Sequence, residues 1–220
     1  MAGAWGDLGC FSFFANKNLA TGEGGMVTTE RDDLAEKVRL MRSHGMTTLT
    51  WDRHKGHAHS YDVVALGYNY RIDEMRSALG LVQMEKLYLN NALRRDITRA
   101  YQDGLKGVEG ISIPFEDHPG ISAAHLFPIL LDENMDRGAF MEAMKSRGIQ
   151  TSIHYPPIHQ FTYYRGQMGE IHLPLTESIG AREVTLPLFS KMTEAQVGLV
   201  VEGVKEAVRV RGSAGAGERG

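Results

Sequence analysis

Lys17 lies between an apolar run and a glycine-rich turn, a position from which a lysine can act as a nucleophile. The run at residues 10–14 (CFSFF) is short and rich in aromatic residues, which predicts a buried strand that ends just before Lys17. A glycine-rich turn at 22–25 and a second β-like run at 26–29 (MVTT) follow it. Apolar surroundings favour the neutral amine that Schiff-base chemistry requires. The alternative interpretation is a surface lysine at a strand end.

Three further groups of side chains have suitable chemistry for binding a phosphate or a polar substrate. Ser12 lies five residues before Lys17, and Asn69 lies in the block GYNYR at 67–71. A serine hydroxyl or an asparagine amide can donate a hydrogen bond to a phosphate oxygen. The segment HYPPIHQ at 154–160 places two histidines and Tyr155 in a loop stiffened by prolines. The alternatives are a serine on the polar face of a strand, an asparagine in a turn, and ordinary loop histidines.

A metal site is not predicted. His54, His57 and His59 have the spacing H-x-x-H-x-H, which is not a standard zinc pattern, and no cysteine lies near them. We expect a solvated loop or a substrate lid at these residues.

The composition excludes several classes of protein. The 220 residues are 42% hydrophobic, and the net charge of −3 gives no footprint for binding nucleic acid. The single cysteine rules out an intrachain disulfide and favours a reducing compartment. No apolar run approaches the roughly 20 residues that span a membrane, so we expect a cytoplasmic protein.

Hydrophobic periodicity predicts alternating helices and strands after the glycine turn. We expect a helix through Leu34 and Met41 capped by Gly45, a long loop over 47–69, and a long helix over 72–106 that Asp73 favours at its start. Further along, the pattern predicts strands at 111–115, 125–131 and 149–155, a helix at 139–148 ended by Gly148, and a final amphipathic helix with Thr193 as its N-cap. The basic side chains Arg94, Arg95 and Arg99 are expected on a solvated helix face.

Several blocks of the sequence resemble one enzyme family. The string SFxxxK followed by GEGG is similar to the lysine signature of the pyridoxal-phosphate-dependent sugar aminotransferases known as the DegT/DnrJ/EryC1/StrS family. The resemblance extends over about residues 6–208 and continues through RSHGM (42–46), GYNYRIDEMRSALGLVQMEKL (67–87), HLFPI (125–129), HYPPIHQ (154–160) and LPLTESIGAREVTLPLF (173–189).

The resemblance implies an α/β fold with two parts. Residues 1–72 correspond to the end of a type I aminotransferase large domain, which binds the cofactor and carries the lysine strand. Residues 73–210 correspond to the small C-terminal α/β domain with its long linking helix, and residues 211–220 are expected to be a disordered tail.

The resemblance also implies a reaction and its residues. Lys17 is matched to the lysine that holds pyridoxal phosphate and then serves as acid and base in transamination; a related branch of the family with histidine at this position performs dehydration instead. Ser12 is matched to a phosphate-binding serine, and Asn69 to an asparagine that reaches the cofactor phosphate of the neighbouring subunit in a homodimer. His154, Tyr155 and His159 correspond to a loop on the substrate side. The implied substrates are a keto-sugar, nucleotide-linked, and an amino donor such as glutamate.

The resemblance covers only the second half of the family pattern. The phosphate-gripping loop, the aromatic that stacks on the cofactor ring and the aspartate that pairs with its nitrogen belong to the first half. Three hypotheses follow: an aminotransferase half that needs the remaining portion, a non-catalytic remnant or interaction module that keeps the small domain and dimer surface, and a self-sufficient small cofactor binder. The presence of Lys17, Ser12 and Asn69 favours the first.

Overall fold

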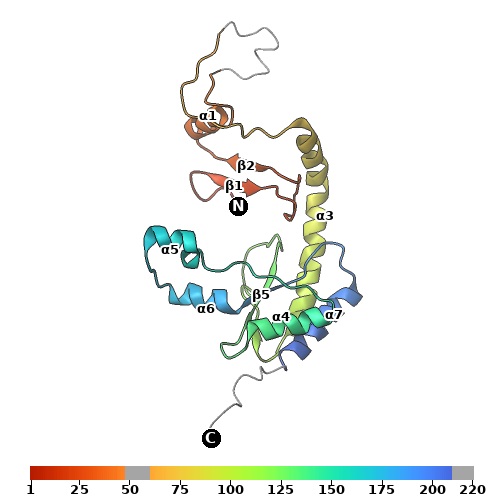
Figure 1. Ribbon diagram of the computed structural model, residues 1–220. Coiled ribbons are helices and arrows are strands. Elements are labelled where there is room, and N and C mark those ends of the chain that lie inside the picture. The colour runs from red at the N-terminus through yellow and green to blue at the C-terminus, as the bar shows by residue number, and fades with distance from the viewer. Residues whose placement is uncertain (48–59, 210–220) are drawn as a thin grey trace. The chain divides into compact units, whose positions relative to one another are not determined.

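The computed structural model describes residues 1–47 and 60–209 (Figure 1). The chain forms two compact units, Met1–Tyr88 and Leu89–Gly220. The functional division expected between residues 72 and 73 stays a prediction. The histidines at 54, 57 and 59 and the expected tail at 211–220 lie outside the described residues.

Unit 1 contains a two-stranded antiparallel sheet. Strands β1 (Gly9–Ser12) and β2 (Gly25–Thr28) pair with Phe11 opposite Met26 and Ser12 opposite Gly25. Both strands were expected, but the predicted burial is wrong, since Phe11 is 41% exposed. No hydrophobic side chain in the described part of unit 1 is buried, because no second layer there covers the sheet.

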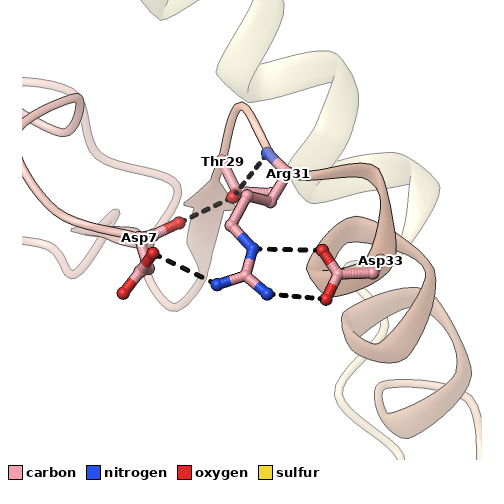
Figure 2. Close-up of polar contacts among 4 residues, drawn as sticks. All are labelled: Asp7, Thr29, Arg31 and Asp33. Carbon is pink, nitrogen blue, oxygen red and sulfur yellow. Dashed lines mark hydrogen bonds and ion pairs between the residues drawn. The ribbon is translucent and has the colours of Figure 1, made fainter.

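Polar contacts tie the open ends of the sheet to helix α1 (Asp32–Met41), as Figure 2 shows. The Arg31 guanidinium donates to both carboxylate oxygens of Asp33, at 3.1 and 2.8 Å, and to Asp7 Oδ1 at 3.3 Å. Thr29 Oγ1 donates to the Asp7 carbonyl at 2.6 Å and accepts from the Arg31 amide at 3.1 Å. The hydrogen bonds from Arg31 lower the pKa of Asp33. The chain entering β1 is thereby linked to the chain leaving β2.

Helix α1 ends earlier than expected. Its C-cap is Arg42, so the prediction of Gly45 as the cap is wrong. Gly45 still helps to end the helix, because its amide donates to the Leu40 carbonyl at 2.9 Å. Its φ of +68° lies in the left-handed region that glycine adopts without strain.

The expected long helix is confirmed as α3 (Glu74–Leu105). Asp73 Oδ1 accepts a hydrogen bond from the Arg76 amide at 2.8 Å, which satisfies one free donor of the first turn. The buried residues of α3, Ile97, Tyr101 and Leu105, all lie near its C-terminal end, in unit 2. Despite the length of α3, none of the helices in residues 1–47 and 60–209 is apolar enough over a sufficient length to cross a membrane.

Unit 2 is built on a three-stranded antiparallel sheet in the order β3–β4–β5 (Figure 1). The strands are β3 (Ile111–Ser112), β4 (Phe127–Leu131) and β5 (Glu183–Leu186). The helical elements are α4 (Arg137–Ser146), the short 3-10 helix η1 (Ile158–Gln160), α5 (Thr162–Met168), α6 (Pro174–Arg182) and α7 (Glu194–Ala207).

Unit 2 contains fewer strand residues and more helices than the sequence pattern predicts. The strand expected at 111–115 is only two residues long, and the one expected at 149–155 is absent apart from an isolated bridge between Ser152 and Thr185. The helix at 139–148 is confirmed as α4, with Gly148 following its C-cap at a φ of +73°. The Thr193 cap is also confirmed, since its hydroxyl accepts from the Gln196 amide and the Gln196 side chain accepts in return from the Thr193 amide. The sequence pattern missed β5, α5 and α6.

One hydrophobic core lies in unit 2. Alternate residues of β4 point into it, and α4 and α7 contact each other beside it. Its buried members are Ile97, Tyr101, Leu105, Phe127, Ile129, Leu131, Phe140, Met144, Ile149, Val184, Leu186, Val197, Val200, Val201, Val204 and Ala207. Gly203 lets α7 approach closely, because a Cβ there would lie 2.5 Å from Ile149 Cδ1.

Arg94 does not lie on a solvated face, which corrects the prediction. Its Nη1 donates to the carbonyl oxygens of Leu188, His125 and Ala124 at 3.0, 3.3 and 3.4 Å. Partial burial lowers the pKa of Arg94. Arg95 is half-buried, and its Nη1 donates to the Ser122 carbonyl at 3.4 Å, whereas Arg99 forms an exposed pair with Asp96. Sequence alone could not separate these neighbours, since the carbonyl partners come from distant segments.

We predict that Tyr101→Phe destabilises the chain by about 1–3 kcal/mol, because it leaves a part-buried carbonyl unpaired. The Tyr101 hydroxyl donates to the Pro187 carbonyl at 2.7 Å, and the side chain is 0% exposed. Urea unfolding followed by circular dichroism measures the change. Tyr88→Phe on the same helix is the matched control, because Tyr88 is 88% exposed and we expect no loss there. Equal midpoints for the two variants would contradict the prediction.

Candidate functional site

Lys17 lies in a turn that local hydrogen bonds hold at the end of β1. The Phe13 amide donates to the Gly24 carbonyl at 2.8 Å, and the Thr21 amide donates to the Phe13 carbonyl at 2.9 Å, which closes the loop at its base. The Lys17 amide donates to the Phe14 carbonyl at 2.9 Å. The side chain is half-buried, and its amine has no hydrogen bond or ion pair with the described residues. The backbone is therefore fixed while the amine remains available.

Thr21 anchors the far side of this loop. It is the one threonine of the turn, it is buried, and its hydroxyl donates to the Glu23 carbonyl at 2.7 Å. Sequence reasoning missed Thr21, since a threonine before a glycine gives no signal of burial. Its contacts brace the segment that returns from Lys17 to β2.

Ser12 is the last residue of β1 and is exposed. Its hydroxyl oxygen accepts a weak hydrogen bond from the Phe14 amide at 3.3 Å. The hydroxyl proton is thus left to be donated to a ligand oxygen. This geometry is compatible with the predicted phosphate contact.

Asn69 is held in place by pairing between two motifs of the sequence. It forms an isolated antiparallel bridge with Ser43, and the flanking bonds are His44 amide to Tyr68 carbonyl and Tyr70 amide to Arg42 carbonyl, both at 2.9 Å. The pairing requires Gly67, because a Cβ at that position would lie 2.1 Å from the Gly45 amide nitrogen. RSHG and GYNYR therefore form one structural element that presents the exposed Asn69 side chain, a pairing that the sequence did not reveal.

Within the described residues no hydrogen bond joins any two of Lys17, Ser12 and Asn69. A groove of about 990 Å³ lies in unit 1, between the sheet, α1 and the segment that leads into α3, and none of these three residues lines it. Its lining combines apolar side chains with several arginines and includes Phe11, Met26, Val38, Arg42, Tyr70 and Arg71.

His154 and Tyr155 lie in unit 2, in the loop predicted to face the substrate. The His154 amide donates to Glu183 Oε2 at 2.8 Å, and its ring Nδ1 lies 2.8 Å from Thr185 Oγ1. The Tyr155 ring meets the His154 ring edge-on, at 4.8 Å between centroids, and is exposed. These two side chains are thus adjacent, and one of them is fixed by β5.

His159 is buried at 8% exposure, which an ordinary loop histidine would not be. Its Nε2 lies 2.9 Å from Glu177 Oε1, which also accepts from the Leu173 amide at 2.8 Å. The hydrogen bond from the Leu173 amide, and then that from His159, lower the pKa of Glu177. His159 therefore links η1 to α6. Its predicted role in substrate binding stays a prediction, and Glu177 is a partner that the sequence did not indicate.

Lys17, Ser12 and Asn69 have the chemical groups that a phosphate-bearing aldehyde such as pyridoxal phosphate would need. An available amine at a fixed turn can condense with an aldehyde, and the exposed donors Ser12 and Asn69 suit phosphate oxygens. Among the described residues, no three histidine, cysteine, aspartate or glutamate side chains gather as a metal site would require.

Comparison with known proteins gives consistent matches over nearly the whole chain. The family model of the DegT/DnrJ/EryC1/StrS aminotransferases matches residues 1–205. The spore coat polysaccharide biosynthesis protein SpsC of Bacillus subtilis is 36% identical over 216 residues, which are 95% of this chain and 56% of that protein.

Two solved structures show the same fold. The Helicobacter pylori protein PseC, an aminotransferase involved in the biosynthesis of pseudoaminic acid, superposes with a TM-score of 0.87 at 28% identity, over 94% of this chain and 54% of that one. The putative sugar aminotransferase Spr1654 of Streptococcus pneumoniae, in its PLP form, gives a TM-score of 0.85 at 26% identity, over 94% and 53%. The predicted fold class is confirmed. The chain spans about half the length of the proteins it matches.

We predict that Glu177 stabilises unit 2 above its ordinary pKa of 4.5 and progressively less in acid. The pKa is lowered in the folded chain, so the stabilisation is present above the unfolded value and is lost as the pH falls through the folded value. Glu177→Gln should therefore reduce the loss of stability between about pH 5 and about pH 3, measured by urea unfolding. Glu170→Gln, at an exposed glutamate nearby, is the control. Parallel pH profiles for wild type and Glu177→Gln would refute this.

Proposed function

The chain belongs to the DegT/DnrJ/EryC1/StrS aminotransferase family, and from this premise we propose that it is the lysine-bearing part of a pyridoxal-phosphate-dependent sugar aminotransferase. It acts in amino-sugar biosynthesis in the cytoplasm, on a nucleotide-linked keto-sugar with an amino donor such as glutamate. The observation that carries this proposal is the half-buried Lys17, held in a closed turn at the end of β1 with its amine available.

Each predicted site residue then has a defined task. Bound pyridoxal phosphate supplies an aldehyde that condenses with amines and a ring that withdraws electrons from the reacting carbon. Lys17 Nζ would hold the cofactor covalently, and the same amine would serve as the group that moves a proton to and from the reacting carbon. Ser12 donates to the phosphate of the same subunit, and Asn69 donates to that of the neighbouring subunit in a homodimer. Lysine rather than histidine at position 17 supports transamination.

The substrate class is supported by the relatives and by the loop at 154–160. PseC is described as acting in the biosynthesis of pseudoaminic acid, and SpsC in that of the spore coat polysaccharide. His154 and Tyr155 offer a ring nitrogen and an exposed aromatic face, which suit a sugar. We assign His154, Tyr155 and His159 to substrate recognition in this enzyme.

Unit 1 supports a role that needs a further polypeptide. Its sheet has only two strands, so each strand has one outer edge without a partner strand in the described residues. Such a two-stranded sheet is marginal on its own. Its apolar side chains are exposed, whereas unit 2 has a closed core. We propose that the portion of the family fold that this chain does not span covers the groove in unit 1 and completes the cofactor site.

The closed core of unit 2 also favours a second candidate function. A non-catalytic remnant or interaction module would keep this unit and its dimer surface while unit 1 lost its chemistry. The two candidates differ in whether Lys17 reacts with the cofactor once the chain is completed.

We predict that Lys17 alone is modified when the chain is co-expressed with the first half of SpsC, incubated with pyridoxal phosphate and reduced with borohydride. Peptide mapping should show the label at Lys17, because its amine is held in a preformed turn. Lys17→Arg should lose the label and at least a thousandfold of the transamination rate, on the order expected for loss of a covalent and acid–base group.

Lys37→Arg is the matched control, since Lys37 is an exposed lysine of α1 in the same unit, and it should keep both label and rate. A label elsewhere would refute the role of Lys17. A stable, correctly assembled complex without label would favour the non-catalytic module.

We predict that Asn69 acts across the dimer. Lys17→Arg and Asn69→Ala variants of the completed enzyme should each be impaired, and mixing them should restore part of the activity, because one site of a mixed dimer contains both residues intact. Exchange of subunits is monitored with differently tagged variants and native mass spectrometry. Proven exchange without any recovery would place Asn69 in the same subunit as the Lys17 it serves.

A further inference from the structure

We propose that Glu183 and Thr185 fix the ring of His154 so that its Nε2 accepts a hydrogen bond from a sugar hydroxyl, rather than meeting the phosphates of a nucleotide. The inference rests on the proposed function for the identity of the ligand. The orientation of the ring follows from the described residues alone. Glu183 and Thr185 are positioning residues, because they act through His154.

The carboxylate of Glu183 is buried. Glu183 is 6% exposed, and a buried carboxylate is costly unless hydrogen bonds satisfy it. Its Oε2 accepts from the His154 amide at 2.8 Å, and its Oε1 accepts from the Thr185 hydroxyl. Both carboxylate oxygens are therefore engaged, one with the backbone of the loop and one with the neighbouring side chain of β5.

The single proton of the Thr185 hydroxyl decides the direction of the hydrogen bond between Thr185 and His154. A threonine hydroxyl has one proton to donate, and an ionised carboxylate can only accept. Since Thr185 gives its proton to Glu183, its oxygen must accept from the ring nitrogen of His154, which lies 2.8 Å away. His154 Nδ1 therefore carries the hydrogen. In the neutral imidazole the other nitrogen, Nε2, is then unprotonated and can only accept a hydrogen bond.

Strand β5 holds Glu183, Thr185 and the approach to His154 in fixed positions. Glu183 and Thr185 are two residues apart on β5, so their side chains lie on the same face of the strand. The Thr185 backbone exchanges two hydrogen bonds with Ser152, at 2.8 and 3.1 Å, which ties the approach to His154 onto the strand. The bare nitrogen is thus held by a buried network rather than by a freely rotating side chain.

The unprotonated ring nitrogen of His154 determines which class of ligand can bind to it. His154 is half-buried and its Nε2 has no hydrogen-bond partner among residues 1–47 and 60–209. An unprotonated ring nitrogen accepts a hydrogen bond from a donor such as a hydroxyl. A phosphate diester oxygen carries no proton near neutral pH, so its lone pairs are repelled by this nitrogen. The exposed ring of Tyr155 beside it offers an apolar surface for the carbon–hydrogen face of a sugar. Together they favour a neutral, hydroxyl-rich group.

The ring orientation is tested on the 220-residue chain without any ligand. Long-range nitrogen–proton NMR of histidine labelled with nitrogen-15 distinguishes the two neutral tautomers, and His154→Gln assigns the signal. We expect the Nδ1–H tautomer in the wild type. It should persist in Thr185→Ser, which keeps the hydroxyl, and be lost in Thr185→Val, which has the same shape without it.

An Nε2–H tautomer or an imidazolium in the wild type would overturn the proposal. So would the same tautomer in Thr185→Val as in the wild type. Amide spectra that match the wild type outside the loop confirm that each variant is folded. This experiment does not depend on catalysis, so its outcome is separate from that of the proposed function.

The ligand class is tested in the completed enzyme with UDP-glucose and UDP as inhibitors. We expect UDP-glucose to bind more tightly than UDP, and Thr185→Val to lose about fivefold to tenfold of that advantage, as one hydrogen bond would account for. Thr185→Ser should keep the advantage, and borohydride labelling at Lys17 should be unchanged in both variants. Equal affinity of the wild type for the two inhibitors, or equal weakening of both by Thr185→Val, would show that His154 does not recognise the sugar hydroxyls. Absence of the Lys17 label in the wild type would instead count against the proposed function.

Discussion

Burial of one face of the three-stranded sheet is the interaction on which unit 2 depends. Ile129 and Leu131 on β4 and Val184 on β5 are fully buried in the same core as residues of α4 and α7. This packing fixes β5, and β5 in turn supplies Glu183 and Thr185, which hold the loop at His154. The polar chemistry of the loop is therefore set by an apolar core on the other side of the strand.

Arginine side chains satisfy the backbone where regular structure ends in unit 2. Arg94 binds three carbonyl oxygens, Arg137 donates to the Gly180 carbonyl at 2.5 Å, and Arg182 donates to the Leu131 carbonyl at 2.8 Å. A guanidinium has five donors and can serve several acceptors that no strand or helix pairs. These contacts join the C-terminal half of α3, the start of α4 and the end of α6 to segments far away in the sequence. They explain why basic residues that resemble a solvated surface in the sequence are partly buried in the fold.

The sequence predicted the parts of the fold that depend on local signals. The long apolar period gave α3, the Thr193 cap gave the start of α7, and the apolar runs around Lys17 gave both strands of unit 1. It failed at 149–155, where the apolar residues do mark burial, as Ile149 shows, but only Ser152 pairs with another strand. In β5 all four residues are buried, including two polar ones, so no alternation was available to reveal it.

The features of the candidate site that the sequence did not predict depend on contacts between distant segments. The positions of Lys17 and Asn69 followed from motifs, but the pairing of Ser43 with Asn69 depends on two segments meeting in space. The buried state of His159 depends on Glu177, which lies 18 residues away. Hydrogen-bond partners at such separations are set by tertiary structure, and they cannot be predicted from the chemical type of a residue.

The turn that presents Lys17 has a consequence for the order in which the chain folds. Its closing bonds join Phe13 to Gly24 and Thr21 to Phe13, so every residue that shapes the turn lies within a dozen positions of the others. A loop of about ten residues closes in about 10–100 ns, far faster than the collapse of a whole domain. Contacts at short separation also have a low entropic cost of closure. The position of Lys17 therefore depends on the most local contacts of unit 1, which have the lowest entropic cost to form.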